Sequence, residues 1–171
     1  MDIILIIGLP GSGKTTFINN NYKNKCDFKI FDDFKANAIN NNSDFYKSRY
    51  YSDISKIINN ESKDIVISDI DFCDFEQFKD AVCKLKQLIT RSTSEYIIKA
   101  KIFKNNLRQC KENIRNDNSN NMEDRIKKAK EYSDKYHPKK IKKELKDNAE
   151  IIEVYSGYWY RFSKRLKSKY N

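Results

Sequence analysis

The sequence predicts an α/β fold, with strands and helices alternating along a single domain of 171 residues. Three apolar runs, over residues 2–7, 64–69 and 95–103, are long enough for buried strands and too short for helices. The segments between them carry apolar side chains at helical spacing, most clearly over residues 75–90. The first apolar run leads directly into a glycine-rich turn, so that strand, turn and helix are expected to follow one another from the start of the chain.

The remaining elements are predicted from caps, periodicity and breaks in the pattern. In chain order they are a helix over 14–22, a strand over 26–31, helices over 45–59, 105–115 and 122–136, a basic helical turn over 139–146 and a last strand over 151–155.

The glycine-rich turn fits the phosphate-binding pattern of Gly, four residues and then Gly-Lys-Ser/Thr. Its backbone N–H groups can point inward at a polyphosphate, and the N-terminus of the following helix faces the same anion. Lys14 adds a cation near the outer phosphates, and the hydroxyl of Thr15 can hold Mg²⁺. The predicted nucleotide-binding residues of the turn are Gly8, Pro10, Gly11, Ser12, Gly13, Lys14, Thr15 and Thr16.

Carboxylates follow two of the predicted strands. Asp32 and Asp33 come directly after the second strand, where one of them can accept a proton from an attacking hydroxyl or position it; the alternative is a pair that caps the next helix. Asp69 ends the run over 64–69 and is the predicted carboxylate for Mg²⁺, acting through water. Asp71 follows closely and is predicted to face the substrate, or else to cap the next helix.

The two helices that follow the strand over 95–103 predict a lid over about 105–137. Arg108 and Arg115 precede a polar, asparagine-rich hinge, and Arg125 follows it. Closure would exclude water and bring guanidinium groups to the nucleotide, with Arg115 at the transferring phosphate; an ordinary exposed helical hairpin is the alternative. Arg49, on an earlier predicted helix, is a candidate contact to the acceptor.

The net charge of +10 is concentrated in the second half of the chain. Residues 1–90 carry 12 Lys and Arg against 13 Asp and Glu, and residues 91–171 carry 22 against 11. A basic half beside a phosphate-binding turn favours a polyanionic partner such as nucleic acid, whereas a coding bias toward Lys and Asn is the alternative. The aromatic, basic tail over about 158–171 can stack on bases or pack as a closing helix.

The four cysteines form no close pair, so neither a zinc site nor a redox pair is predicted. The chain shows no signal peptide, and no apolar run is long enough to cross a bilayer. The sequence therefore predicts a cytoplasmic protein with no membrane partner.

Gly8–Thr16, Asp32-Asp33-Phe34-Lys35 and Ile67-Ser68-Asp69 together resemble motifs of the kinase domain of phage-type polynucleotide 5′-kinases, within the P-loop kinases. The resemblance covers about residues 1–155. It implies a three-layer sandwich of the P-loop NTPase type, with a parallel sheet between helices and a helical lid.

The same resemblance implies transfer of the γ-phosphoryl group of ATP to a hydroxyl. It makes Asp32 the general base, places Lys14 and Thr15 on the phosphates and Mg²⁺, and places Asp69 near the metal. Asp33 and Lys35 become candidates for binding the acceptor. The family has Arg where this chain has Lys35, and a lysine cannot hold a phosphate through two parallel hydrogen bonds.

The leading hypothesis is an ATP- and Mg²⁺-dependent phosphotransferase acting on a nucleic-acid 5′-hydroxyl. One alternative keeps the chemistry and changes the acceptor to a nucleoside, nucleotide or other small molecule. A basic groove leading to Asp32 would favour nucleic acid, and a closed pocket around it a small molecule. The other alternative is a non-catalytic, nucleotide-gated binding module, which would bind ATP without acceptor-dependent release of ADP.

Overall fold

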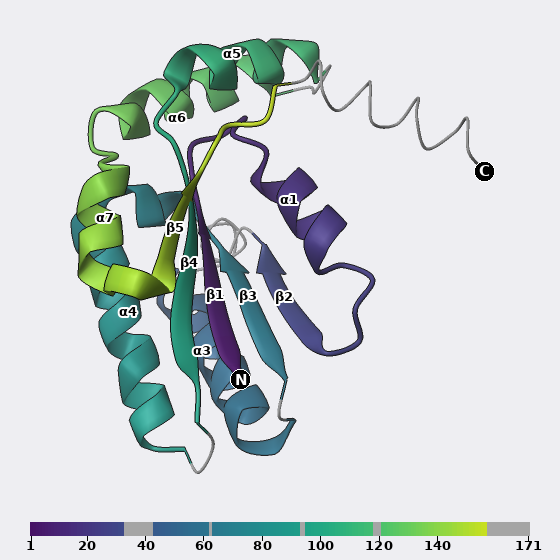
Figure 1. Ribbon diagram of the computed structural model, residues 1–171, viewed down its shortest axis with the longest axis vertical. Coiled ribbons are helices and arrows are strands. Elements are labelled where there is room, and N and C mark those ends of the chain that lie inside the picture. Colours follow the sequence, from purple (N-terminus) through teal and green to yellow (C-terminus); the bar gives the residue numbers. More distant parts are fainter. Residues whose placement is uncertain (33–42, 62, 93–94, 118–120, 157–171) are drawn as a thin grey trace.

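The computed structural model describes residues 1–32, 43–61, 63–92, 95–117 and 121–156, and of residues 43–50 it describes the backbone alone. Five strands form one parallel sheet in the order β2-β3-β1-β4-β5, flanked by helices (Figure 1). The predicted α/β fold is therefore confirmed. A parallel sheet of this kind is consistent with a P-loop-like fold.

The central strand β1 (Asp2–Ile7) is buried at every residue after the first. It pairs with β3 (Asp64–Ser68) on one side and with β4 (Ile97–Phe103) on the other, while β2 (Phe28–Asp32) and β5 (Ala149–Ile152) form the two ends of the sheet. A continuous Ile/Leu run suits β1, because helices cover both faces of such a sheet. All five strands point the same way, so their carboxyl ends share one edge, the carboxyl edge.

Helices cover the two faces of the sheet unequally. On one face α3 (Ser43–Asn60), α4 (Phe75–Thr90) and α7 (Pro138–Leu145) contribute their apolar stripes to the larger core. On the other face α1 (Lys14–Asn21) packs alone among the described helices, through Ile18. In the described part of the chain, no helix combines the length and the apolar character that a bilayer span requires.

The remaining helices lie beyond the carboxyl edge. There α5 (Leu107–Asn116) and α6 (Met122–Ser133) run beside each other above the strand ends (Figure 1). The two helices predicted after β4 are therefore present, and they stand at the edge where parallel α/β sheets bind their ligands. Their action as a lid stays a prediction.

Among the predicted boundaries that differ from the structure, two are informative. The last strand was expected over 151–155 but spans Ala149–Ile152, because Ala149 pairs with Ala100 and the chain leaves the sheet after Ile152. The helix expected to reach residue 136 ends at Ser133, because Tyr136 turns inward to the core. In both places a long-range contact determines where the element ends.

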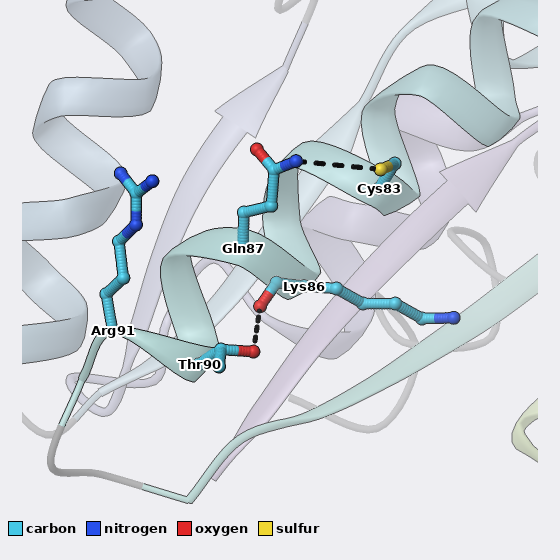
Figure 2. Close-up of a pocket in the computed structure, with 5 residues that line it drawn as sticks. All are labelled: Cys83, Lys86, Gln87, Thr90 and Arg91. Carbon is cyan, nitrogen blue, oxygen red and sulfur yellow. Dashed lines mark hydrogen bonds between the residues drawn. The ribbon is translucent and has the colours of Figure 1, made fainter.

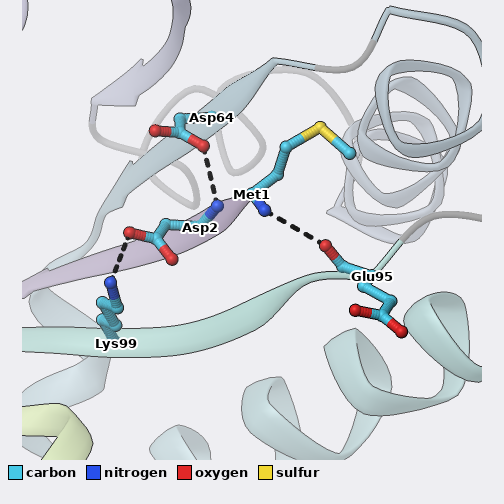
Figure 3. A network of polar contacts seen from close by, with 5 residues as sticks. All are labelled: Met1, Asp2, Asp64, Glu95 and Lys99. Atoms are coloured by element: carbon cyan, nitrogen blue, oxygen red, sulfur yellow. Dashed lines mark hydrogen bonds and ion pairs between the residues drawn. The ribbon is translucent and has the colours of Figure 1, made fainter.

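Polar contacts hold the opposite, amino edge of the sheet. The Lys99 ammonium pairs with the carboxylate of Asp2 at 2.6 Å, and the Asp2 N–H donates to Asp64 Oδ1 at 2.7 Å (Figure 3). The amino group of Met1 donates to the carbonyl of Glu95 at 3.1 Å. These contacts keep β1, β3 and β4 in register, and they lie at the other end of the strands from the phosphate-binding turn.

Tyr136 joins β1 to β4 at the carboxyl edge. Its side chain is 1% exposed, and its hydroxyl lies 2.5 Å from the carbonyl oxygen of Phe103 and 3.2 Å from that of Ile7. Burial raises the pKa of Tyr136 far above its ordinary value, so the phenol stays neutral and acts as a donor.

We expect Tyr136→Phe to lower the free energy of unfolding by about 1–3 kcal/mol, because it leaves buried carbonyl groups without their donor. Chemical denaturation followed by circular dichroism measures this loss. Tyr22→Phe is the control, since the hydroxyl of Tyr22 has no hydrogen-bond partner among the described residues; its effect should stay within about 0.5 kcal/mol. Equal losses in the two variants would contradict the assignment.

Candidate phosphate-binding site

Backbone hydrogen bonds close the turn between β1 and α1, the phosphate loop (Gly8–Gly13), and join it to the helix that follows. The N–H of Ser12 donates to the carbonyl of Leu9 at 3.1 Å, and the N–H of Phe17 donates to that of Gly13 at 2.8 Å. Gly11 and Gly13 have φ values of 78° and 97°, in the left-handed region that favours glycine. All the predicted loop residues lie in this turn or, from Lys14 to Thr16, in the first turn of α1.

The surroundings of the loop leave no room for side chains at its glycines. A Cβ atom at Gly11 would lie 2.4 Å from the carbonyl oxygen of Cys110 on α5. One at Gly13 would lie 2.5 Å from the ring of Tyr155, and one at Gly8 would lie 2.8 Å from Cβ of Phe103. All three glycines are therefore required by packing against β4, α5 and the segment after β5, and Gly11 and Gly13 are required by their backbone conformation as well.

Lys14 lies against the loop that precedes it. Its ammonium donates to the carbonyl of Gly8 at 2.7 Å and to that of Leu9 at 3.1 Å. An ammonium has three hydrogens, so two of these donors hold the side chain on the loop and the third can reach an anion beside it. The cation thus lies against the phosphate loop, and its contact with phosphates stays a prediction.

Thr15 and Asp32 meet across the carboxyl edge. The Thr15 hydroxyl donates to Asp32 Oδ2 at 3.2 Å, although the two residues come from α1 and from β2 at the end of the sheet. The contact is possible because Asp32 pairs with Ser68 of β3, and the alternation of the strands turns both side chains to the face that α1 covers. The Asp32 carboxylate therefore lies beside the Thr15 hydroxyl, in the first turn of α1.

Asp69 directly follows β3 and is buried, with 2% exposure. Its carboxylate accepts a hydrogen bond from the N–H of Asp71 at 2.8 Å and so caps a short 3₁₀ turn, η1 (Ile70–Cys73). The structure thus assigns Asp69 a capping contact at the carboxyl edge, and its predicted role toward Mg²⁺ stays a prediction.

Asp71 is tied to the helical hairpin. The hydroxyl of Tyr132, on α6, donates to Asp71 Oδ1 at 2.5 Å. Burial raises the pKa of Tyr132 above its ordinary value, and the hydrogen bond and charge of Asp71 raise it further. The cap of α4 is Asp74 instead, which accepts from the N–H groups of Glu76 and Gln77.

Two buried hydroxyl groups in this region have no hydrogen-bond partner among the described residues: Ser12 Oγ in the loop and Ser68 Oγ at the end of β3. Buried polar groups are nearly always hydrogen-bonded to protein or water, so each one requires an explanation. Ser68 lies on the same face as Asp32 and at the same register. A water molecule or ligand oxygen at the Thr15–Asp32 contact would be near it.

The residues present fit a magnesium ion that is held mainly by phosphate and water. Within the described ranges, no three His, Cys, Asp or Glu side chains gather into a metal site of their own. Mg²⁺ normally keeps several waters and takes one or two protein oxygens together with substrate phosphates. The hydroxyl of Thr15 and the carboxylate of Asp32 are the side-chain oxygens that meet at the loop.

Two of the three predicted lid arginines pair with carboxylates of their own hairpin. Arg108, whose side chain is 92% exposed, pairs with Glu112 at 3.3 Å, and Arg125 pairs with Asp117 at 2.6 Å. Arg115 lies exposed in the last turn of α5. Nucleotide contacts of these side chains stay predictions. The contacts to the acceptor that are predicted for Asp33, Lys35 and the side chain of Arg49 lie outside the described residues.

Two neutral thiols pack beneath the loop. Burial raises the pKa of Cys73 to about 12 and that of Cys110 to about 11, while the nearby charge of Lys14 lowers both. At neutral pH the two groups remain thiols and serve as small apolar side chains. All four cysteines of the chain are free.

A separate hollow of about 270 Å³ lies at the far end of α4 (Figure 2). Because α4 begins at the carboxyl edge and runs back along the sheet, this end is remote from the phosphate loop (Figure 1). Two contacts within α4 shape the hollow: Gln87 Nε2 to Cys83 Sγ at 3.9 Å and Thr90 Oγ1 to the Lys86 carbonyl at 2.8 Å. The hollow has no part in the site at Asp32.

Replacing Gly11 by alanine tests the close packing of the loop. The new Cβ would collide with the Cys110 carbonyl and would strain the left-handed backbone, so we expect a loss of about 1–3 kcal/mol in the free energy of unfolding. Asn20→Ala, at an exposed position of α1, is the control and should change stability by no more than about 0.5 kcal/mol. A Gly11→Ala protein as stable as the native one would show that the contact with α5 is not tight.

Neither the comparison with protein-family models nor the comparison with curated proteins finds a match for this chain.

Proposed function

We propose that this protein is an ATP- and Mg²⁺-dependent phosphotransferase that moves the γ-phosphoryl group to a nucleic-acid 5′-hydroxyl. The observation that carries the proposal is the meeting of Thr15 and Asp32 beside the phosphate loop. The loop and Lys14 supply a place for phosphates, and Asp32 supplies a base next to that place.

Asp32 acts as the general base in this proposal. The oxygen of the acceptor hydroxyl forms a bond to the γ-phosphorus while the bond from that phosphorus to the β–γ bridging oxygen breaks. The hydroxyl proton passes to the Asp32 carboxylate, and ADP leaves. A carboxylate can accept about four hydrogen bonds, so the bond from Thr15 leaves Asp32 with capacity to accept the proton of the acceptor hydroxyl.

Lys14 and the loop amides position the nucleotide and neutralise its charge. With two of its hydrogens on the carbonyls of Gly8 and Leu9, the Lys14 ammonium is held at the loop before any ligand arrives. Such preorganised donors stabilise charge without rearranging during the reaction. Mg²⁺, when bound, supplies further neutralisation of the phosphate oxygens, and Thr15 is the residue that would hold it.

The charge at the carboxyl edge supports a polyanionic acceptor. Helices α5 and α6 carry seven Lys and Arg residues against four Asp and Glu. They lie beyond the strand ends, at the same end of the sheet as the phosphate loop (Figure 1). A basic surface beside the loop attracts phosphate-rich chains, and its binding would weaken as salt increases.

Labelled ATP with a panel of acceptors tests the proposal. The full-length protein should transfer label to DNA or RNA that carries a 5′-hydroxyl, and not to the same oligonucleotides carrying a 5′-phosphate. We expect Lys14→Ala to lose transfer by at least about a hundredfold, because the loop loses its cation. We expect Asp32→Asn to lose at least about a hundredfold in turnover while its affinity for ATP stays within about threefold, because the amide cannot accept the proton.

Each result assigns the function differently. An Asp32→Asn protein with near-native turnover would remove the general-base role. Label in nucleosides, nucleotides or other small molecules, with none in any oligonucleotide, would make the acceptor a small molecule. ATP binding with no transfer to any acceptor would leave a nucleotide-dependent binding module.

A further inference from the structure

The amide of Asn113 joins the phosphate loop to two distant parts of the chain. Its Nδ2 atom, which carries two hydrogens, donates to the carbonyl of Gly11 at 2.8 Å and to the carbonyl of Tyr155 at 2.5 Å. Asn113 lies on α5, Gly11 in the loop, and Tyr155 three residues after β5. One side chain therefore connects three segments that are far apart in the sequence.

A neighbouring residue fixes the orientation of this amide. Gln109, one helical turn earlier on α5, donates from Nε2 to Asn113 Oδ1 at 3.1 Å. This bond occupies the carbonyl end of the Asn113 amide, so the NH₂ end faces the loop. Because the two residues are four positions apart on α5, their side chains meet on one face of the helix, and this contact fixes the orientation of the Asn113 amide.

The segment after β5 holds the loop from a second side. The N–H of Tyr155 donates to the carbonyl of Ser12 at 3.2 Å, and its ring packs against Gly13. The carbonyl groups of Gly11 and Ser12 are thus both bound by partners outside the loop. A site for an anion requires this, because carbonyl oxygens that turned toward the ligand would repel it.

We propose that Asn113 is a positioning residue, which keeps the phosphate loop in its anion-binding shape through its bonds to Gly11 and Tyr155. The inference rests on the proposed function, because the ligand is the phosphate chain of ATP. A loop with three glycines can flip its peptide planes easily, and each plane carries a carbonyl and the next N–H together. Holding the Gly11 carbonyl therefore also holds the N–H of Ser12 on the carbonyl of Leu9, the bond that closes the loop, and ATP meets a loop that is already ordered.

The test compares Asn113→Asp with Asn116→Asp in the full-length protein. Both changes add one carboxylate to α5, but Asn116 is exposed at the end of the helix. Titration calorimetry with ATP and Mg²⁺ should give an affinity at least about tenfold weaker for Asn113→Asp and within about twofold of native for Asn116→Asp. In the nucleotide-free protein, hydrogen exchange at the amides of Ser12 and Tyr155 should be faster only in Asn113→Asp.

The pH dependence separates positioning from a general loss of structure. At low pH the carboxyl of Asn113→Asp takes up a proton and regains one donor, so its ATP affinity relative to native should recover as the pH falls. A variant that was merely misfolded would not recover. If Asn113→Asp does not fold, Gln109→Ala replaces it and should also accelerate exchange at Ser12, since the amide loses the bond that orients it.

The outcomes distinguish this inference from the proposed function. Native ATP affinity in Asn113→Asp, with native exchange at Ser12 and Tyr155, would overturn the inference and leave the function intact. No ATP binding by the native protein would overturn the proposed function and, with it, the role of Asn113 in binding ATP. Faster exchange in Asn113→Asp would then still support its effect on the loop shape, and unchanged exchange would remove that as well.

Discussion

The close packing of three glycines against distant parts of the chain determines the geometry of the candidate site. Gly8 lies against Phe103 of β4, Gly11 against Cys110 of α5, and Gly13 against Tyr155, each too close for a side chain. A glycine-rich turn would otherwise have many conformations, and ordering it would reduce any affinity for a ligand. Because β4, α5 and the segment after β5 pack against the turn, it is held in one conformation before a ligand binds. Lys14 and Thr15 follow directly from that turn and take their positions from it.

The same packing limits how the helical hairpin can move. Helix α5 contacts the loop at Gly11, through the carbonyl of Cys110 and the side chains of Asn113 and Ile114. If the loop is to keep its shape, this part of α5 has to stay in place. Any closing movement then belongs to the hairpin beyond Ile114, where α6 is joined to η1 by the hydrogen bond between Tyr132 and Asp71.

Much of the fold and the centre of the site could be predicted from the sequence, because both depend on local patterns. Residues close together in the sequence specify the Ile/Leu run of β1, the glycine spacing, and the placement of Lys14 and Thr15. The position of Asp32 followed from the end of a predicted strand, although the structure makes it the last residue of β2 instead of the first residue after it. The strand alternation that turns Ser68 to the side of Asp32 could also have been read from the sequence, once the end of β3 was known.

The rest depends on contacts between residues far apart in the chain, which one sequence does not specify. Asn113 reaches Gly11 across 102 residues and Tyr155 across 42, and Tyr132 reaches Asp71 across 61. The sequence predicted a helix over 105–115, but not that the phosphate loop would lie against it. The end of β5 was misplaced for the same reason, since the Tyr155 N–H bonds to Ser12 instead of extending the strand.

A crystal structure of the full-length protein with Mg²⁺ and a non-hydrolysable ATP analogue is the most direct test of the central claim. We expect the β- and γ-phosphates to lie within the phosphate loop, within hydrogen-bond distance of its backbone N–H groups and of the Lys14 ammonium. We also expect the bonds from Asn113 to Gly11 and Tyr155 to remain in place. An analogue bound elsewhere on the protein, or a loop that stays empty at saturating nucleotide, would contradict the account.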